Sequence, residues 1–155
     1  MSTNECLEHE PDEQSVERTL LALLAVLIPP GRSGSVPGAA DIGFPATVRA
    51  TDDYPAIREG LLRLMAAAQH GHGREFPDLD RTEQARMIDG LKVKDFRFFS
   101  ALSIQIIKSY YQDAKVMTAL GHNHRPPFPL GHDVAEGDLS LLEPVYERGR
   151  KYRTW

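Results

Sequence analysis

The sequence predicts an all-α fold: a compact single domain of about five or six helices with a long proline-rich loop and extended termini. Three observations lead to this prediction. Apolar residues recur at helical spacing in several segments, whereas no segment shows the strict alternation of a half-buried strand. Prolines and glycines stand between those segments and mark where helices end. The chain has 155 residues, enough to enclose one hydrophobic core without disulfides or metals.

The first helix is expected to follow an acidic tail. Residues 1–14 are acidic with few apolar side chains, so they are predicted to be disordered. Ser15 can cap a helix that has Glu17 in its first turn and continues through the apolar run Leu20–Ile28. The Pro29–Pro30 pair ends this helix, because proline cannot donate the helical hydrogen bond. The run is apolar on every side, which predicts that the rest of the protein encloses it.

Two helices are expected in the next part of the chain. Residues 39–50 predict a short helix that Gly43 and Pro45 interrupt. Thr51 or Asp52 can cap the following helix, which has an apolar stripe on one face and ends at residues 71–73.

Three more helices follow. Asp80 and Glu83 have the spacing of a capping box, and the helix that they begin carries Ala85, Ile88 and Leu91 inward. A long aromatic helix is predicted over residues 94–111, and a short one over residues 114–121.

The long aromatic helix carries more apolar surface than one buried face requires. One side can pack on the core of its own domain, and the other could meet the Leu20–Ile28 helix or a second protein. We therefore expect this helix to form part of a partner interface. The residues expected there are Phe98, Phe99, Leu102, Ile106, Tyr110 and Tyr111.

The loop that follows is a second candidate contact. Residues 125–131 read Arg-Pro-Pro-Phe-Pro-Leu-Gly, and each proline fixes its own φ, so the loop loses little entropy on docking. Arg125 and Phe128 are the expected contact residues, with Phe128 as the apolar anchor. The loop could instead wrap its own domain.

The last eight residues, 148–155, form a basic aromatic tail. The tail could be a solvated end, an arm that packs on an acidic partner through Tyr152 and Trp155, or a nucleic-acid contact. The expected organisation is thus a disordered tail at residues 1–14, a helical domain at residues 15–147 and this basic tail.

Composition argues against several classes of protein. The formal net charge of −4 disfavours a general nucleic-acid binder, and the single cysteine, Cys6, cannot form an intrachain disulfide. The longest apolar run, Leu20–Ile28, is too short to span a bilayer, so we expect no direct membrane insertion. Acidic residues precede this run instead of the positive leader of an export signal.

Catalytic motifs are not found, and no catalytic, cofactor-binding or metal-binding residue is assigned. No serine lies in a Gly-x-Ser-x-Gly elbow, and no glycine pattern forms a phosphate cradle. His122, His124 and His132 could place imidazoles near one point, but their spacing matches no metal motif.

Several short motifs in this order resemble one protein family. They are Leu23 to Pro29, Pro37 to Gly43, Tyr54 to Leu61, Phe76 to Leu79, Phe98-Phe99, Tyr110-Tyr111 and Leu120-Gly121, with Arg125 to Pro129 at the end. Together they resemble the gluconate 2-dehydrogenase subunit 3 family, the small subunit of membrane-associated flavoprotein dehydrogenases. The resemblance covers roughly residues 18–132.

The resemblance implies a non-catalytic accessory subunit that works in a heteromer. Its partner would be a large GMC-type dehydrogenase subunit that carries FAD and oxidises a sugar, sugar acid or polyol, with a cytochrome c subunit as a further member. The small subunit would support folding, stability or export of the large one, in a chaperone-like role. Members often begin with a twin-arginine signal; this chain shows none, so we expect it in the cytoplasm, or in the periplasm if an exported partner carries it.

Two other classes of function remain open at this point. One is a stand-alone metal-dependent enzyme that uses the three histidines, and the other is a helical regulatory protein that binds through the basic tail.

Overall fold

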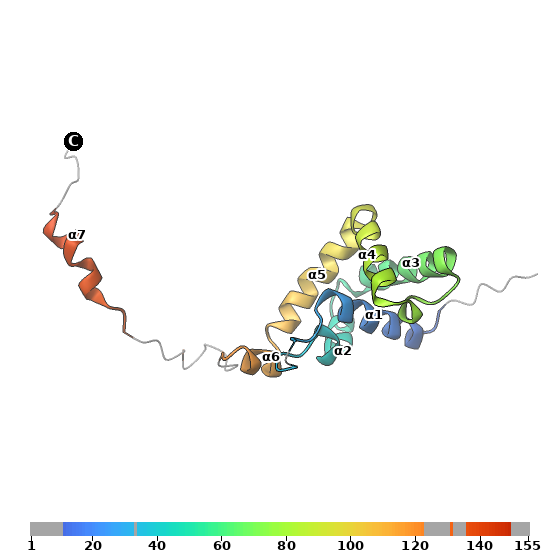
Figure 1. The fold of residues 1–155 in the computed structure, drawn as a ribbon, viewed down its shortest axis with the longest axis horizontal. Coiled ribbons are helices and arrows are strands. Elements are labelled where there is room, and N and C mark those ends of the chain that lie inside the picture. The colour runs from blue at the N-terminus through green and yellow to red at the C-terminus, as the bar shows by residue number, and fades with distance from the viewer. Residues whose placement is uncertain (1–10, 33, 123–130, 132–135, 150–155) are drawn as a thin grey trace, which may run out of the picture. The chain divides into compact units, whose positions relative to one another are not determined.

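The structure, a computed structural model, describes residues 11–32, 34–122, 131 and 136–149. These residues form seven α-helices and three 3-10 helices and contain no strand, which confirms the predicted all-α fold. The chain divides into two compact units, residues 1–124 and residues 125–155. The hydrophobic core lies in the first unit (Figure 1).

Helix α1 spans Glu13–Leu27 and begins earlier than predicted. Its N-cap is Asp12, whose carboxylate accepts a hydrogen bond of 2.8 Å from the Ser15 backbone N–H, so the prediction of Ser15 as cap was wrong. Residues 13 and 14, assigned to the tail from sequence, are therefore helical. Residues 1–10 lie outside the described part of the chain.

The apolar half of α1 is only partly enclosed, because Leu21, Val26, Leu27 and Ile28 are half-buried. Leu20, Leu23 and Leu24 are buried, and the helix ends just before the Pro29–Pro30 pair. None of the described helices is both long and apolar enough to cross a membrane.

The short helix predicted over residues 39–50 is divided into η1 (Ala39–Asp41) and α2 (Phe44–Arg49). Before η1, the chain folds back onto the end of α1. A Cβ atom on Gly38 would lie 2.9 Å from the Pro30 nitrogen and 3.0 Å from the Ile28 carbonyl oxygen. This close backbone approach explains why a residue without a side chain stands there.

Helix α3 spans Tyr54–His72, with Pro55 in its first turn. Its N-cap is Asp53, one residue later than predicted. The predicted end is confirmed, because Gly73 is the C-cap and has a left-handed φ of 64°. The 3-10 helix η2 (Phe76–Asp78) follows.

Helix α4 spans Arg81–Lys94, and its predicted capping box is confirmed. The Asp80 carboxylate accepts 2.8 Å hydrogen bonds from the backbone of Thr82 and Glu83, and the Glu83 carboxylate accepts one of 3.0 Å from the backbone of Asp80.

Helix α5 (Phe96–Tyr110) follows after a single intervening residue, Asp95. It begins later than predicted, because Asp95 ends α4 and accepts a hydrogen bond from the backbone N–H of Phe98 in the first turn of α5. Helix α6 spans Ala114–Ala119 and ends the helices of the first unit.

The second unit contains η3 (Leu139–Leu142) and α7 (Glu143–Glu147). The proline-rich loop, apart from Gly131, and residues 150–155 of the basic tail lie outside the described residues.

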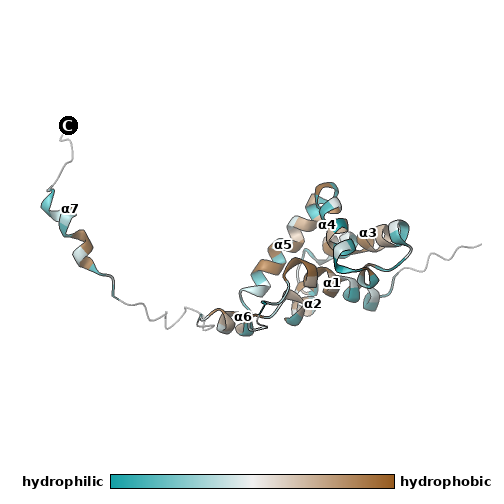
Figure 2. Ribbon diagram, viewed as in Figure 1, coloured by the Kyte–Doolittle hydropathy of each residue, from teal (hydrophilic) through white to brown (hydrophobic). Residues whose placement is uncertain are grey.

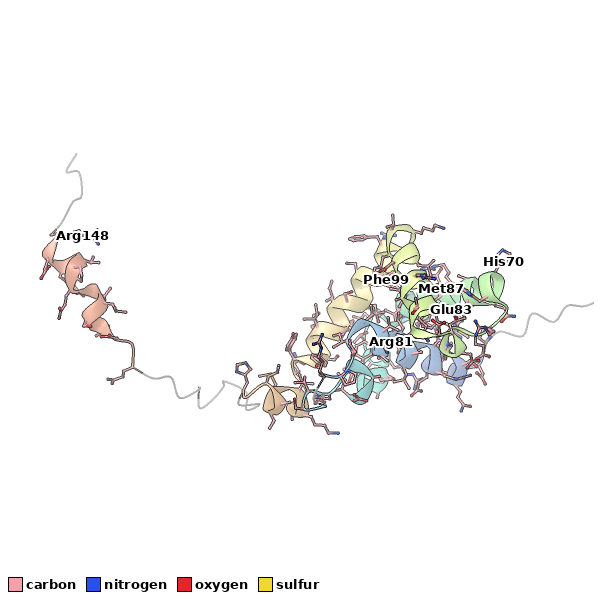
Figure 3. The ribbon with its side chains drawn as sticks, in the orientation of Figure 1. His70, Arg81, Glu83, Met87, Phe99 and Arg148 are labelled. Atoms are coloured by element: carbon pink, nitrogen blue, oxygen red, sulfur yellow. The ribbon has the colours of Figure 1, made fainter. Side chains whose placement is uncertain are left out.

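Within the first unit, α1 contacts η1, α2, α3, η2 and α4, whereas α5 packs on α2, α3 and α4. The Arg81 guanidinium on α4 donates a 2.6 Å hydrogen bond to the carbonyl of Ala25 in the last turn of α1 (Figure 3). The side of α5 that faces away from α2, α3 and α4 is therefore a candidate surface for binding a partner.

Candidate partner-binding surface

The inner face of α5 belongs to the core of the first unit. Its apolar members are Phe98, Phe99, Leu102, Ile106 and Tyr110, each at most 6% exposed. The ring of Phe98 lies against the backbone of α3 at Gly60, where any side chain would overlap it. The ring of Phe98 thus packs directly on the backbone of α3.

Two polar contacts fix the rotation of α5 about its axis. The Tyr110 hydroxyl donates a 2.7 Å hydrogen bond to the carbonyl of Pro37, and burial raises the pKa of this phenol above its ordinary value of 10.0. The Gln105 amide, which is also buried, donates a 2.5 Å hydrogen bond to the Asp53 carboxylate at the start of α3. Both bonds hold the same face of α5 toward the core.

The outer face of α5 consists of Phe96, Ile104, Ile107 and Tyr111, which are 73%, 49%, 56% and 54% exposed. Together with Ser100, these residues follow one another at spacings of four, four, three and four, so they lie along one side of the helix. Figure 2 shows hydrophobic residues alternating with hydrophilic ones along α5. Exposed apolar and aromatic side chains gathered on one side of a helix, here interrupted by Ser100, are typical of a surface that a protein partner covers.

The charged residues within α5 itself have one sign. Helix α5 contains two cations, Arg97 and Lys108, and no carboxylate. Both cations are exposed, and neither forms an ion pair within the described part of the chain. The outer face of α5 thus offers apolar contact with a positive rim, which suits a partner surface that is apolar with an acidic edge.

The residues that were expected at an interface differ in their exposure. Phe98, Phe99, Leu102, Ile106 and Tyr110 are buried in their own core, so they cannot touch a partner unless the domain opens. Tyr111 is exposed, and Arg125, Phe128, Tyr152 and Trp155 lie outside the described residues. An interface on this helix stays a prediction, but it would use Phe96, Ile104 and Ile107 in place of the five buried residues.

The sequence pattern could have indicated the three exposed residues that were not predicted, Phe96, Ile104 and Ile107. Ile104, Ile107 and Tyr111 have the three-and-four spacing of a helix seam, and Phe96 extends it toward the N-terminus. The sequence pattern alone shows two apolar faces, and it does not say which of them meets the core. The contact with Gly60 on α3 belongs to the inner face, because the missing side chain there lets the Phe98 ring lie against the backbone of α3.

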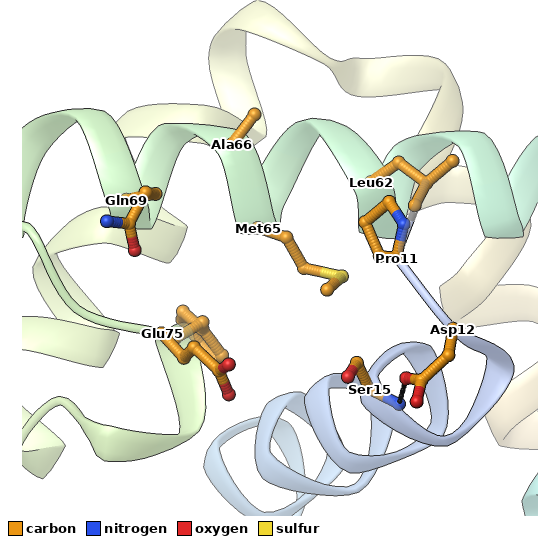
Figure 4. Close-up of a pocket in the computed structure, with 9 residues that line it drawn as sticks. Pro11, Asp12, Ser15, Leu62, Met65, Ala66, Gln69 and Glu75 are labelled. Carbon is orange, nitrogen blue, oxygen red and sulfur yellow. Dashed lines mark hydrogen bonds between the residues drawn. The ribbon is translucent and has the colours of Figure 1, made fainter. Parts of the chain in front are cut away.

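A groove of about 440 Å³ lies between the start of α1, the middle of α3 and η2 (Figure 4). Leu62, Met65 and Phe76 provide much of its apolar lining. Its carboxylates have structural roles: Asp12 caps α1, and Glu75 forms a 2.9 Å ion pair with Arg18. We find no pair of nucleophile and base in this lining.

The histidines give no support for a metal site in the described chain. The described residues contain no group of three or more histidine, cysteine, aspartate or glutamate side chains that could hold a metal ion. Of the three histidines considered from sequence, His122 is exposed, while His124 and His132 lie outside the described residues. His70 lies exposed in the last turn of α3 (Figure 3).

The described residues thus define an all-α domain that leaves apolar side chains of α5 exposed. The family model described as gluconate 2-dehydrogenase subunit 3 matches residues 14–129. This match covers well over half of the chain, so the protein belongs to the gluconate 2-dehydrogenase subunit 3 family, as its sequence motifs suggested. No curated protein and no solved structure matches the chain.

Proposed function

We propose that this chain is the non-catalytic small subunit of a sugar, sugar-acid or polyol dehydrogenase. In this proposal it binds and stabilises a large GMC-type subunit that carries the FAD, and it helps that subunit to fold or to be exported. Family membership supports a role as one subunit of a multi-subunit dehydrogenase. The observation that carries the proposal is the outer face of α5, which is apolar and positively rimmed.

The rest of the assembly follows from the same proposal. A cytochrome c subunit is a further proposed member, which would accept electrons from the flavin subunit. The chain itself would then hold no cofactor, and the FAD would be bound entirely by the large subunit. Its location would follow that of the partner, cytoplasmic or, if an exported partner carries it, periplasmic.

The experiment compares this chain alone with the chain co-expressed with the FAD-carrying GMC-type subunit that is proposed as its partner. The chain alone is expected to lack flavin absorbance and dehydrogenase activity. The co-expressed pair is expected to purify as one complex with both properties. Flavin bound in stoichiometric amount by the isolated chain, or two proteins that purify separately, would contradict the proposal.

A substitution on the outer face of α5 tests where the subunits meet. Ile107→Asp places a charge at the centre of the apolar face and is expected to weaken the complex by about 2 kcal/mol or more. Since Ile107 is more than half exposed, the isolated variant should still fold, which its circular dichroism and melting temperature would show. Thr82→Asp, on the exposed start of α4, introduces the same charge away from this face and should leave the affinity unchanged. Equal affinity of both variants would place the interface elsewhere.

A further inference from the structure

The groove between the start of α1, the middle of α3 and η2 contains no residue of α5 and has the form of a peptide-binding site. Every residue that lines it lies between positions 11 and 76, within the first unit. Its volume of about 440 Å³ is within the range of about 300–1,000 Å³ that ligand sites occupy. It opens to solvent beside the exposed side chains of Ala66 and Gln69, so an extended segment can enter it from outside.

Apolar side chains form the inside of this groove. Phe76 is fully buried, and Leu62 and Met65 are half-buried on α3. The side chain of Met65 points from α3 into the groove (Figure 4). Methionine is flexible and polarisable, so it adapts to apolar groups of different shape. The groove is therefore suited to a bulky apolar side chain of a bound segment.

The charge around the groove is negative even after its ion pairs are counted. The carboxylates of the lining and of the ion pairs beside it are Asp12, Glu13, Glu17, Glu75 and Asp78, and the arginines paired with them are Arg18, Arg49 and Arg58. Five negative and three positive charges leave a formal charge of −2. Arg74, which precedes Glu75, is matched by Glu83 at 3.0 Å.

The sequence next to the groove adds to this negative charge. Directly before Pro11, which lines the groove, stand Glu5, Glu8 and Glu10 and no lysine or arginine. An acidic region of this kind repels anionic lipid surfaces and nucleic-acid phosphates. It attracts a protein segment in which lysine or arginine stands beside an apolar residue, because complementary charges favour the encounter and the apolar side chain fills the groove.

We infer that this acidic groove binds a segment of the large subunit in which a bulky apolar side chain is flanked by lysine or arginine. The inference rests on the proposed function for the identity of the partner, since the chain belongs to a family of dehydrogenase subunits. The contact is separate from the outer face of α5, where the charged residues are the cations Arg97 and Lys108. The two surfaces have opposite charge, so they need different sites on the large subunit.

The first test obstructs the groove in the full-length chain and measures Kd for the purified FAD-carrying subunit. Ala66→Arg fills part of the groove and adds a charge of the same sign as the bound segment. It is expected to raise Kd about tenfold or more, the loss expected when an anchoring side chain is displaced. Ala66 is exposed and arginine favours helices, so the melting temperature should be unchanged. Ala56→Arg, at an exposed position of the same helix outside the groove, should change Kd by less than about twofold.

A second test removes one carboxylate from the groove. Glu75→Gln is expected to slow association and to reduce its dependence on salt, because charges at the rim of an interface mainly steer the encounter. Glu59→Gln is the matched control: Glu75 pairs with Arg18 at 2.9 Å and Glu59 with Arg63 at 3.0 Å, and all four side chains are about half exposed or more. Equal association rates of the two variants at low salt would overturn the charge argument.

A third test identifies the bound segment. Gln69, exposed at the edge of the groove, is replaced by the photoreactive amino acid benzoylphenylalanine. Irradiation of the purified complex is expected to link this position to a segment of the large subunit that has a bulky apolar residue beside lysine or arginine. Mass spectrometry of the linked peptide gives its sequence, and an acidic segment or one without a bulky apolar residue would contradict the inference.

The outcomes distinguish this inference from the function on which it rests. If the unaltered chain forms no complex with the flavin subunit, both are wrong. If the complex forms and Ala66→Arg and Ala56→Arg bind equally well, the groove inference is wrong while the accessory role stands. If Ala66→Arg changes only self-association, or loses its effect once residues 148–155 are deleted, the groove binds a segment of this chain and the inference is wrong.

Discussion

Gly60 is the residue on which the packing of α5 depends. It lies in the interior of α3, where glycine normally costs about 1 kcal/mol relative to alanine. The ring of Phe98 occupies the space that a side chain at this position would need. Because Phe98 is only 3% exposed, its ring has little room to move away.

Gly60→Ala is therefore expected to destabilise the protein by about 1–3 kcal/mol, because overpacking outweighs the gain in helix propensity. Urea denaturation followed by circular dichroism would measure the change. Gly71→Ala in the same helix is the matched control, since nothing lies within 4 Å of its added methyl group. That variant is expected to be neutral or slightly more stable, and a comparable loss at both positions would show that the Phe98 contact is not the cause.

At the scale of the element, α5 has two apolar faces with different tasks. The inner face supports the fold through Phe98 and its buried neighbours, and the outer face remains available through Phe96, Ile104, Ile107 and Tyr111. Phe98 on the inner face and Phe96 on the outer face therefore allow the roles of the two faces to be compared directly.

Phe98→Ala is expected to cost about 3–5 kcal/mol of stability, because it leaves a cavity between α5 and α3. Phe96→Ala is expected to change stability by less than about 0.5 kcal/mol, since its side chain is 73% exposed. For binding to the large subunit, the order of the two effects should be reversed. Phe96→Ala should leave the isolated chain folded and lower its affinity for the large subunit. If Phe96→Ala unfolds the isolated chain, the outer face is part of the core.

The sequence located α5 but did not establish which of its faces meets the core. The run of aromatic and apolar residues, ended by Asp95 on one side, indicates a helix with more than one apolar face. The side that meets the core depends on Gly60, Pro37 and Asp53, which contact Phe98, Tyr110 and Gln105 from distant parts of the chain. Periodicity within one helix contains no information about such contacts.

At the scale of the whole molecule, ionic contacts tie the start of α1 to the helices around it. Glu13 pairs with Arg58 at 3.3 Å and accepts a hydrogen bond from the Tyr54 hydroxyl, both on α3. Arg49 on α2 pairs with Glu17 at 2.8 Å. These contacts connect segments more than thirty residues apart, so they contribute to the stability of the first unit as a whole.

The pH dependence of stability should report on the Glu13 contacts. The hydrogen bond from Tyr54 and the charges of Arg58 and Arg49 hold the pKa of Glu13 below its ordinary value of 4.5. A lowered pKa in the folded state stabilises the protein above the unfolded pKa, and this contribution is lost as the pH falls through the folded pKa. Because the Glu13 side chain is 48% exposed, the contribution should stay below about 1 kcal/mol.

Melting temperatures of the unaltered protein and of Glu13→Gln are therefore expected to differ at neutral pH and to converge as the pH falls below 4.5. A difference that persists unchanged into strong acid would show that Glu13 acts through packing and not through its charge.

Local sequence patterns determined the all-α class, several helix ends and the family of this protein. The capping box at Asp80, the proline pair after Ile28 and the glycine at position 73 depend on neighbouring residues only, so they could be predicted. Only the tertiary structure decided which face of α5 is buried. Burial is a relation between segments that are distant along the chain, and the helical period of a single segment cannot specify it.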